Sequence, residues 1–222
     1  MSERFIMAIS LPNGATLSIA SAYGTATAVS GITNATEAVA TVASATNLTV
    51  GGIVEITSGW SKLNLRLARI KTVTGTAITL EAIDTTNLIK FPAGSGIGSL
   101  RPITTWTQLT QVLEFSTSGG DQNYTNYSFL EDPTERQIPT NKSAQSISVT
   151  LGDDVTLPWY SVLDKADDDK LPRGLRLSLP SGSNIFYDTI ASFNKTPTVT
   201  KNEVMGLAAS FSLTADTTRY AS

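Results

Sequence analysis

Large apolar residues alternate with small polar ones in several segments of the chain, and this alternation predicts β-strands with two unlike faces. In residues 207–214 the odd positions are apolar and the even positions small: Leu207, Ala209, Phe211 and Leu213 against Ala208, Ser210, Ser212 and Thr214. Residues 143–151 repeat the pattern, with Ile147, Val149 and Leu151 opposite Ala144, Ser146, Ser148 and Thr150. A solvated sheet face usually carries Lys, Glu and Arg. A face of short side chains instead predicts a lining past which something moves without adhering.

The hydrophobic pattern divides the chain into three zones. Residues 1–24 form a short leader with a strand-like segment at 15–20, and residues 25 to about 100 contain many short strands separated by Gly and Asn. The third zone predicts a long strand over 103–117 and a polar stretch over 118–142. Strands at 143–151, 174–179, 184–193 and 203–214 follow.

One helix interrupts these strands. Trp159, Val162, Leu163 and Ala166 have the i, i+3, i+4, i+7 spacing of a buried helical stripe. Thr156 is placed to cap its N-terminus, and the helix should end near Asp169. The fold class predicted is therefore mainly β with one helix.

Composition removes several classes of function. The 222 residues include no Cys and no His, which excludes disulfides, thiolate or imidazole metal sites and a Ser-His-Asp triad. A net charge of −3 offers no basic field for nucleic acid, and no apolar run is long enough to span a membrane. The acidic run 167–169 is a solvated helix end rather than a metal loop. We expect no enzyme activity, no cofactor, no metal and no membrane insertion.

The polar stretch 118–142 is longer than most loops within a compact domain, which indicates a function or ordering by a partner. Its aromatic residues Tyr124, Tyr127 and Phe129 either anchor a protein–protein contact or fold back onto their own domain. The strands beside it would leave open sheet edges. Several copies pairing edge to edge would close a multi-subunit barrel, whereas a self-contained β-sandwich with a Ser/Thr-rich outer face is the alternative.

Several short motifs, in order, resemble the major tail tube proteins of long-tailed (siphovirus-type) bacteriophages. The motifs are Lys142–Ser148, Asp153-Asp154, Pro158-Trp159-Tyr160, Leu163-Asp164, Leu179–Gly182, Lys201–Met205 and Ser210–Leu213. Together they cover roughly residues 101–222, about half of the chain.

The resemblance implies two packed antiparallel sheets with one flanking α-helix, six subunits per ring, and rings stacked into a hollow tube. Strands of all subunits would join one inner barrel through which double-stranded DNA passes without being held. Implied partners are further copies of the chain, a tape measure protein in the lumen, a tail terminator, and tail tip or baseplate proteins. Implied locations are the virion tail and, during assembly, the host cytoplasm.

The resemblance also assigns candidate residues. A long loop that reaches the neighbouring ring would use Asp121, Tyr124, Tyr127, Phe129, Glu131, Arg136 and Lys142. Candidate lumen-facing residues are Glu114, Ser146, Ser148, Asp188, Ser210 and Ser212.

A small β-barrel module, similar to modules of phage structural proteins and ubiquitin-activating enzymes, is expected over residues 28–98. Residues 1–27 would then hold the first strand of the tube domain and residues 99–222 its core. The module is expected outside the tube or between rings.

Alternative functions are a related baseplate hub or tail-completion ring, and a surface- or carbohydrate-binding β module. The last would need clustered exposed aromatic residues, and Trp60, Trp106 and Trp159 lie far apart in sequence.

Overall fold

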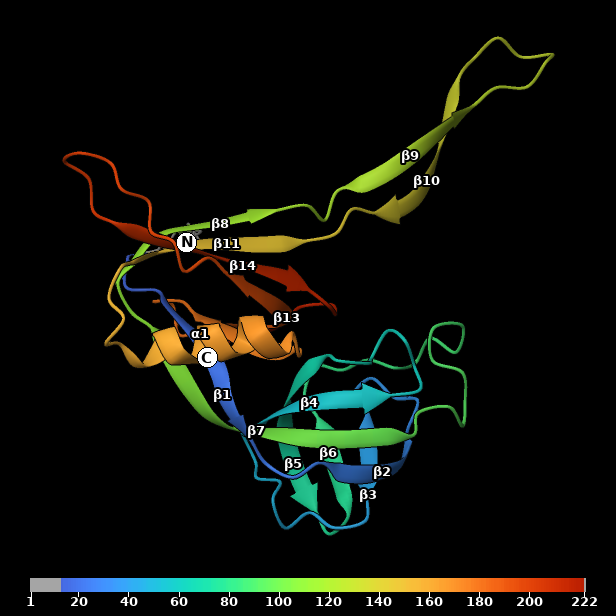
Figure 1. The fold of residues 1–222 in the computed structure, drawn as a ribbon. Coiled ribbons are helices and arrows are strands. Elements are labelled where there is room, and N and C mark those ends of the chain that lie inside the picture. Colours follow the sequence, from blue (N-terminus) through green and yellow to red (C-terminus); the bar gives the residue numbers. More distant parts are fainter. Residues whose placement is uncertain (1–12, 222) are drawn as a thin grey trace, which may run out of the picture.

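The protein is mainly β, as predicted, with a single α-helix among residues 13–221, which are the residues that the computed structural model describes (Figure 1). The strands are β1 (Thr16–Tyr23), β2 (Thr27–Ile32), β3 (Val39–Val42), β4 (Ile53–Ser58), β5 (Leu67–Thr74), β6 (Ala77–Leu80), β7 (Gly98–Leu109), β8 (Val112–Ser118), β9 (Gln122–Tyr127), β10 (Arg136–Lys142), β11 (Ser146–Gly152), β12 (Arg173–Ser178), β13 (Asn184–Phe193), β14 (Gly206–Leu213) and β15 (Thr218–Tyr220). The helix α1 spans Pro158–Asp169. The first half of the expected leader, residues 1–12, lies outside the described residues.

One continuous antiparallel ladder of 13 strands runs β2-β3-β6-β5-β4-β7-β1-β12-β13-β14-β11-β8, and β15 adds to β13. An extra pairing between β2 and β7 closes the first part of this ladder into a small barrel. The remaining strands curl around a second core. Strands β9 and β10 form a separate two-stranded sheet.

The barrel has its own hydrophobic core, which contains side chains from Val29 to Leu100. Trp60 is 2% exposed and packs edge-on against Phe91, with 5.3 Å between ring centroids. Its indole Nε1 donates to the carbonyl of Pro92 at 2.8 Å, so the burial of the ring leaves no unpaired donor. The Gly-rich stretch after Pro92 consequently packs against the barrel and leads directly into β7.

Strand β7 belongs to both halves of the molecule. Its residues 98–102 pair with β4 in the barrel, and its residues from Ile103 to Leu109 pair with β1 in the curled sheet. The expected single strand over 103–117 is therefore wrong at its centre. The chain turns at Gln111, whose φ of 58° is left-handed, and β8 then pairs with β11 on the far side of the sheet.

The second core lies between the curled sheet and α1. It contains the odd-numbered residues predicted for β11 and β14, among them Ile147, Val149 and Phe211, all at most 2% exposed. The helix buries Trp159, Leu163 and Ala166 against it, as the i, i+4, i+7 spacing predicted.

The ends of α1 differ in how well they were predicted. The helix ends at Asp169, followed by a left-handed Lys170 whose N–H donates to the carbonyl of Ala166. The predicted cap at its start is wrong: Leu157 occupies the cap position, and the Thr156 hydroxyl donates instead to Asp154 at 2.6 Å.

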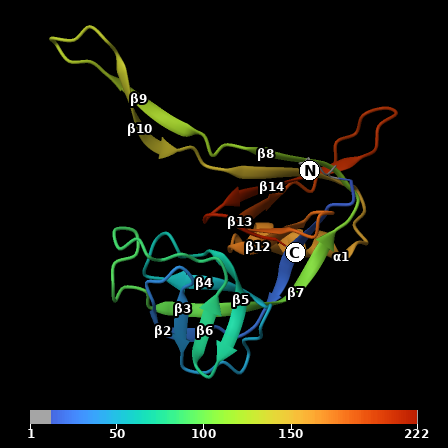
Figure 2. The same ribbon diagram turned by 180° about the vertical axis from the view of Figure 1, so that it is seen from behind.

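The polar stretch 118–142 is an ordered β-hairpin and not an irregular loop. Its strands β9 and β10 pair from Arg136↔Tyr127 to Lys142↔Gln122. We call residues 121–143 the arm, because both views show it standing away from the body (Figures 1 and 2). Tyr127 packs edge-on against Phe129 within the arm, at 5.5 Å, so these aromatic residues do not fold back onto the curled sheet.

Candidate assembly surfaces

One face of the curled sheet is covered by serine, and we call it the serine face. Register aligns Ser118, Ser146 and Ser212 in one row across β8, β11 and β14, and Ser116, Ser148 and Ser210 in the next. Ser192 of β13 extends the second row. The hydroxyls of Ser118 and Ser146 are hydrogen-bonded at 2.9 Å. Short side chains in register therefore form a smooth surface opposite the core, as the alternation of large and small residues predicted.

Five of the six candidate lumen residues share this face. Ser148, Ser210, Ser212 and Glu114 are exposed and Ser146 is half-buried. Glu114 lies beside Thr150, two positions along β11 from Ser148, and it is the one charged side chain that strands β8, β11, β13 and β14 expose on this face. The serine face therefore carries a weak negative charge.

The prediction that Asp188, the sixth candidate, faces the lumen is wrong. It is 1% exposed, so it does not line any open surface. Even-numbered residues of β13 point the same way, and Ile190 and Ser192 are exposed while Phe186 and Asp188 are covered by the barrel. Alternation along β13 puts Asp188 on the same side as Ser192. It did not reveal that a second domain covers that end of the face.

A buried group of charges surrounds Asp188 where the barrel meets the curled sheet, a contact that we call the seam. The Thr214 hydroxyl donates to Oδ2 of Asp188 at 2.6 Å, while its Oδ1 has no hydrogen-bond partner. Burial, reinforced by the nearby carboxylate of Glu55, raises the pKa of Asp188 to about 7. This carboxyl group is therefore poised to change charge near neutral pH.

Arg101 and Glu55 form the main ion pair of the seam. One guanidinium nitrogen of Arg101 donates to both carboxylate oxygens of Glu55, at 2.8 and 2.9 Å, and the Glu55 side chain is only 5% exposed. The same guanidinium lies 4.1 Å from the centre of the Tyr23 ring. The Tyr23 hydroxyl accepts a hydrogen bond from the N–H of Gly174, and burial raises the pKa of Tyr23.

The seam residues are not among the residues predicted from the sequence, although one signal is present. Glu55 interrupts the apolar run Ile53-Val54-Ile56, and a charge inside such a run indicates a buried partner. The partner, Arg101, lies 46 residues away on β7, and only the pairing of β4 with β7 brings the two together.

Strand β15, near the end of the described residues, connects the barrel to the curled sheet at the seam. β15 pairs with β13, and Tyr220 is 3% exposed in a cluster with Ala20, Ile53 and Phe186. The Tyr220 hydroxyl accepts from the N–H of Arg69 at 2.8 Å and donates to the carbonyl of Glu81 at 3.1 Å. A segment after β14 thus bonds directly to β5 and its surroundings, which holds the barrel at one orientation.

Two strand edges border the serine face and are unpaired among the described residues. β8 pairs with β11 alone, and residues 190–193 of β13 pair with β14 alone among the described residues. The Phe193 N–H at the second edge donates to a carboxylate oxygen of Asp167 in α1. Val112 and Leu113, at the start of β8, form an uncovered apolar row and are 39% and 50% exposed. Val112 lies opposite the buried Leu151, and a register shift leaves Leu113 without a paired residue on β11. Unpaired backbone and an uncovered apolar row coincide at β8.

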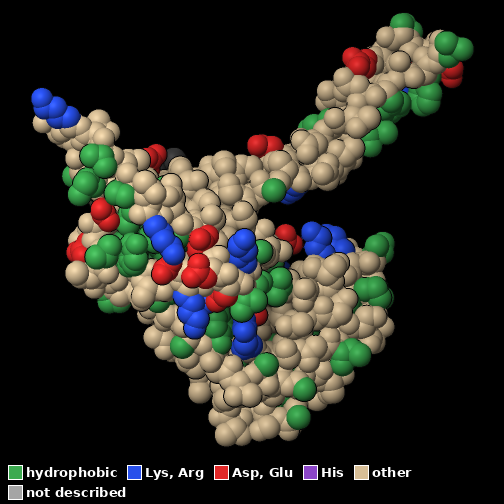
Figure 3. All heavy atoms as spheres, viewed as in Figure 1, with side chains coloured by type: hydrophobic (Ala, Val, Ile, Leu, Met, Phe, Trp, Pro, Cys, Tyr) green, Lys and Arg blue, Asp and Glu red, His purple; other side chains and the backbone are tan. Residues whose placement is uncertain are grey.

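The arm exposes apolar side chains along its length, with Tyr124 57%, Phe129 53%, Ile138 52% and Leu130 105% exposed. Figure 3 shows hydrophobic side chains along the side of the arm that faces the barrel. Of the other candidate arm residues, Arg136 pairs with Asp132 at 2.7 Å, and Asp121, Glu131 and Lys142 are exposed. A two-stranded hairpin alone is marginally stable, so these features are typical of an element that binds a partner.

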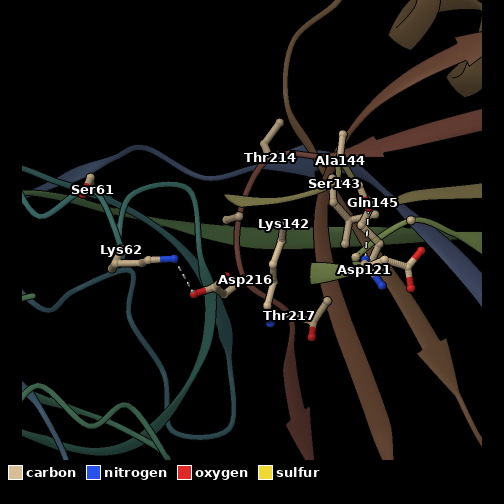
Figure 4. Close-up of a pocket in the computed structure, with 14 residues that line it drawn as sticks. Ser61, Lys62, Asp121, Lys142, Ser143, Ala144, Gln145, Thr214, Asp216 and Thr217 are labelled. Carbon is tan, nitrogen blue, oxygen red and sulfur yellow. Dashed lines mark hydrogen bonds and ion pairs between the residues drawn. The ribbon is translucent and has the colours of Figure 1, made fainter. Parts of the chain in front are cut away.

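A cleft of about 790 Å³ separates the base of the arm from the barrel. The barrel contributes Ser61 and Lys62, the base of the arm contributes residues 119–121 and 142–145, and residues 213–217 form the rest (Figure 4). Lys62 and Asp216 face each other across one side at 3.7 Å, and both are more than half exposed. The lining is polar and carries both signs of charge.

No group of His, Cys, Asp or Glu suited to hold a metal ion occurs within residues 13–221. No described helix is both long enough and apolar enough to cross a membrane.

Comparison with protein families gives one match. A family model described as phage tail tube protein, TTP, matches residues 58–222, which include the second half of the barrel, the arm and the curled sheet apart from β1. No curated protein matches the chain.

Proposed function

This chain belongs to the phage tail tube protein family, and from that membership we propose that it forms stacked hexameric rings whose bore conducts DNA. Family membership gives the chain a structural role in the tail tube of the virion, where it assembles with other tail proteins. The ring, the bore and the DNA are the proposal. The observation that carries it is the serine face lying between two open strand edges.

The direction of the strands supports ring closure. β8, β11, β14 and β13 are each antiparallel to the next, so β8 and β13 also run in opposite directions. When β13 of one copy lies beside β8 of another, the antiparallel alternation continues across the subunit boundary. Such a head-to-tail contact generates a ring when the rotation closes. Six copies would then share one inner barrel with the serine face toward its axis.

The uncovered apolar row on β8 supports the same contact. In β13, the core side of residues 191 and 193 is covered by α1, and Phe193 packs against Trp159 and Tyr160 of that helix. A neighbouring β8 placed beside β13 would bring Phe115, which is paired with the buried Val149 on its core side, toward this helix. The contact would bury apolar area that the isolated chain leaves in water, which favours association.

The serine face suits the passage of DNA. Short hydroxyl and methyl side chains offer few groups that hold phosphate, and Glu114 adds a ring of weak negative charge to the proposed bore. Like charge repels the phosphate backbone and so prevents adhesion. During assembly the same bore would hold a tape measure protein, with a tail terminator and tail tip or baseplate proteins at the two ends. We also propose that the tube assembles in the host cytoplasm and that the chain is not an enzyme.

Residues 28–98 are proposed to be an inserted module, with residues 1–27 and 99–222 forming the tube domain. The separate core of the barrel and its closure by β2 and β7 support this division. The barrel covers Phe186 and Asp188 at one end of the serine-face side of β13, so we propose that it stands at the boundary between rings.

A single-ring role, as a baseplate hub or tail-completion protein, would use the same strand edges. The arm favours stacking, because it extends beyond the strand ends instead of sideways along the ring. A carbohydrate-binding module is not favoured, because Trp60 and Trp159 are buried in different cores and form no exposed aromatic face.

The strand-edge contact is tested with Leu113→Asp, which places a charge in the uncovered row of β8. We expect the concentration needed for assembly, followed by light scattering and negative-stain electron microscopy, to rise at least about tenfold. Val50→Asp is the matched control, since Val50 is 65% exposed on the barrel. Wild-type protein that stays monomeric at high concentration in every salt condition would refute the proposed function.

A further inference from the structure

The two ends of the serine-face strands have opposite shapes. At one end, where β8 ends and β11 begins, the cleft opens between the arm base and the barrel. At the other end, where β8 begins and β14 begins, the connection between β13 and β14 protrudes; we call it the 194–205 loop. Both views show it on the side opposite the arm (Figures 1 and 2).

The 194–205 loop is an ordered projection. Asn194 N–H donates to the carbonyl of Ala208, and Thr198 N–H donates to that of Gly206, both at 2.9 Å, which extends the β13–β14 hairpin outward. At its tip, the N–H of Glu203 donates to the carbonyl of Thr200 at 3.2 Å. Lys201 at this tip is exposed and forms no ion pair with the described residues.

The flanks of the loop are apolar although they lie in water. Val199 is 77% exposed, Val204 70% and Met205 47%. The arm, which overhangs the cleft at the opposite end of the strands, exposes Tyr124 and Ile138 to a similar degree. The 194–205 loop, with its polar tip and apolar flanks, is thus complementary to the polar cleft and the apolar arm at the opposite end of the strands.

The cleft has the size and charge to hold the loop tip. Its volume of about 790 Å³ lies in the range of sites that enclose a drug-sized molecule, roughly 300–1,000 Å³, which is comparable to a short peptide turn. Asp121 on its rim forms no ion pair with the described residues, so its carboxylate is available to a cation.

We infer that the cleft of one copy receives the 194–205 loop of a second copy in the adjacent ring. Lys201 pairs with Asp121, and the arm lies along Val199 and Val204. This inference rests on the proposed stacking and names the receiving surface. The loop and the cleft lie at opposite ends of the serine-face strands. The contact is therefore head-to-tail and repeats without closing, which builds a filament.

Disulfide trapping tests the contact directly, because the natural chain has no cysteine. A chain with Lys201→Cys and Asp121→Cys is assembled, oxidised and separated on a non-reducing gel. We expect a ladder of covalent multimers that extends beyond six chains, because each copy is joined to one above and one below. The single variants, and Lys201→Cys combined with Val50→Cys outside the cleft, should give dimers at most.

Charge reversal gives a second, independent measurement. Lys201→Glu should raise the concentration needed for tube growth about tenfold, and Asp121→Lys in the same chain should restore it. Both side chains are exposed, so the thermal unfolding midpoint should not change.

The outcomes separate the two proposals. Absence of rings and tubes from the natural chain would refute the proposed function itself. Normal tubes that yield no covalent ladder, or that tolerate Lys201→Glu unchanged, would refute only the cleft as the receiving surface.

Discussion

The barrel and the curled sheet are built from the same kinds of short strands, yet they end differently. In the barrel, β2 pairs with both β3 and β7, so every strand has two neighbours and no edge remains. The curled sheet ends at β8, whose outer edge is unpaired and whose Leu113 lies half in water. A closed sheet satisfies its backbone alone, whereas an open one leaves that task to a partner. We therefore propose that the curled sheet and its arm carry the contacts of assembly.

Removal of the arm is the strongest test of this contrast. Replacing residues 123–141 with Asn-Gly would join the paired residues Gln122 and Lys142 through a two-residue hairpin turn. We expect complete loss of tubes with little change in the free energy of unfolding, because the arm contributes nothing to the two large cores. Circular dichroism and electron microscopy measure the two effects. Filaments that still grow would show that stacking does not need the arm.

Substitutions that create a cavity in one core or the other should show whether a loss of stability by itself impairs assembly. Trp60→Ala in the barrel and Phe211→Ala in the curled sheet each remove a fully buried aromatic ring, at a cost of about 3–5 kcal/mol. Both should lower the urea midpoint. At a temperature where both variants are folded, only Phe211→Ala should impair assembly, since it lies directly beneath the serine face. Equal impairment by Trp60→Ala would mean that the barrel takes part in ring closure.

The seam that joins the two regions should depend on pH. The pKa of Asp188 is raised from 3.8 to about 7, so between these values the folded chain keeps a proton that the unfolded chain has released. Stability therefore falls as the pH rises through this window and levels off above about 7. The full effect is on the order of 4 kcal/mol.

Urea unfolding at pH 5 and pH 8 measures this effect. Because Asn cannot ionise, the free energy of unfolding of the Asp188→Asn variant should fall much less between pH 5 and pH 8. The Glu114→Gln variant, changed at an exposed position, is the control and should show the same fall as the natural chain. A natural chain that is equally stable at both pH values would contradict the assignment of a protonated Asp188 to the seam.

The candidate surfaces were predicted unevenly from the sequence. The serine face follows from alternation, and five of the candidate residues lie on it, four of them exposed and Ser146 half-buried. The sequence predicts an unusual polar segment with aromatic residues here but not its hairpin pairing, because Asn123 and Asn126 disfavour strands. Glu55 and Arg101 were missed, because nothing local relates two residues 46 positions apart.

Residue alternation determined which side of each strand is apolar, because successive side chains of a strand point to opposite faces whatever surrounds them. The tertiary structure alone decided which parts of a face meet water. On β13, Ser192 and Asp188 point the same way, and the first is exposed while the second is 1% exposed beneath the barrel. The reason is that orientation is a local property of the backbone, whereas covering depends on strands distant in the chain.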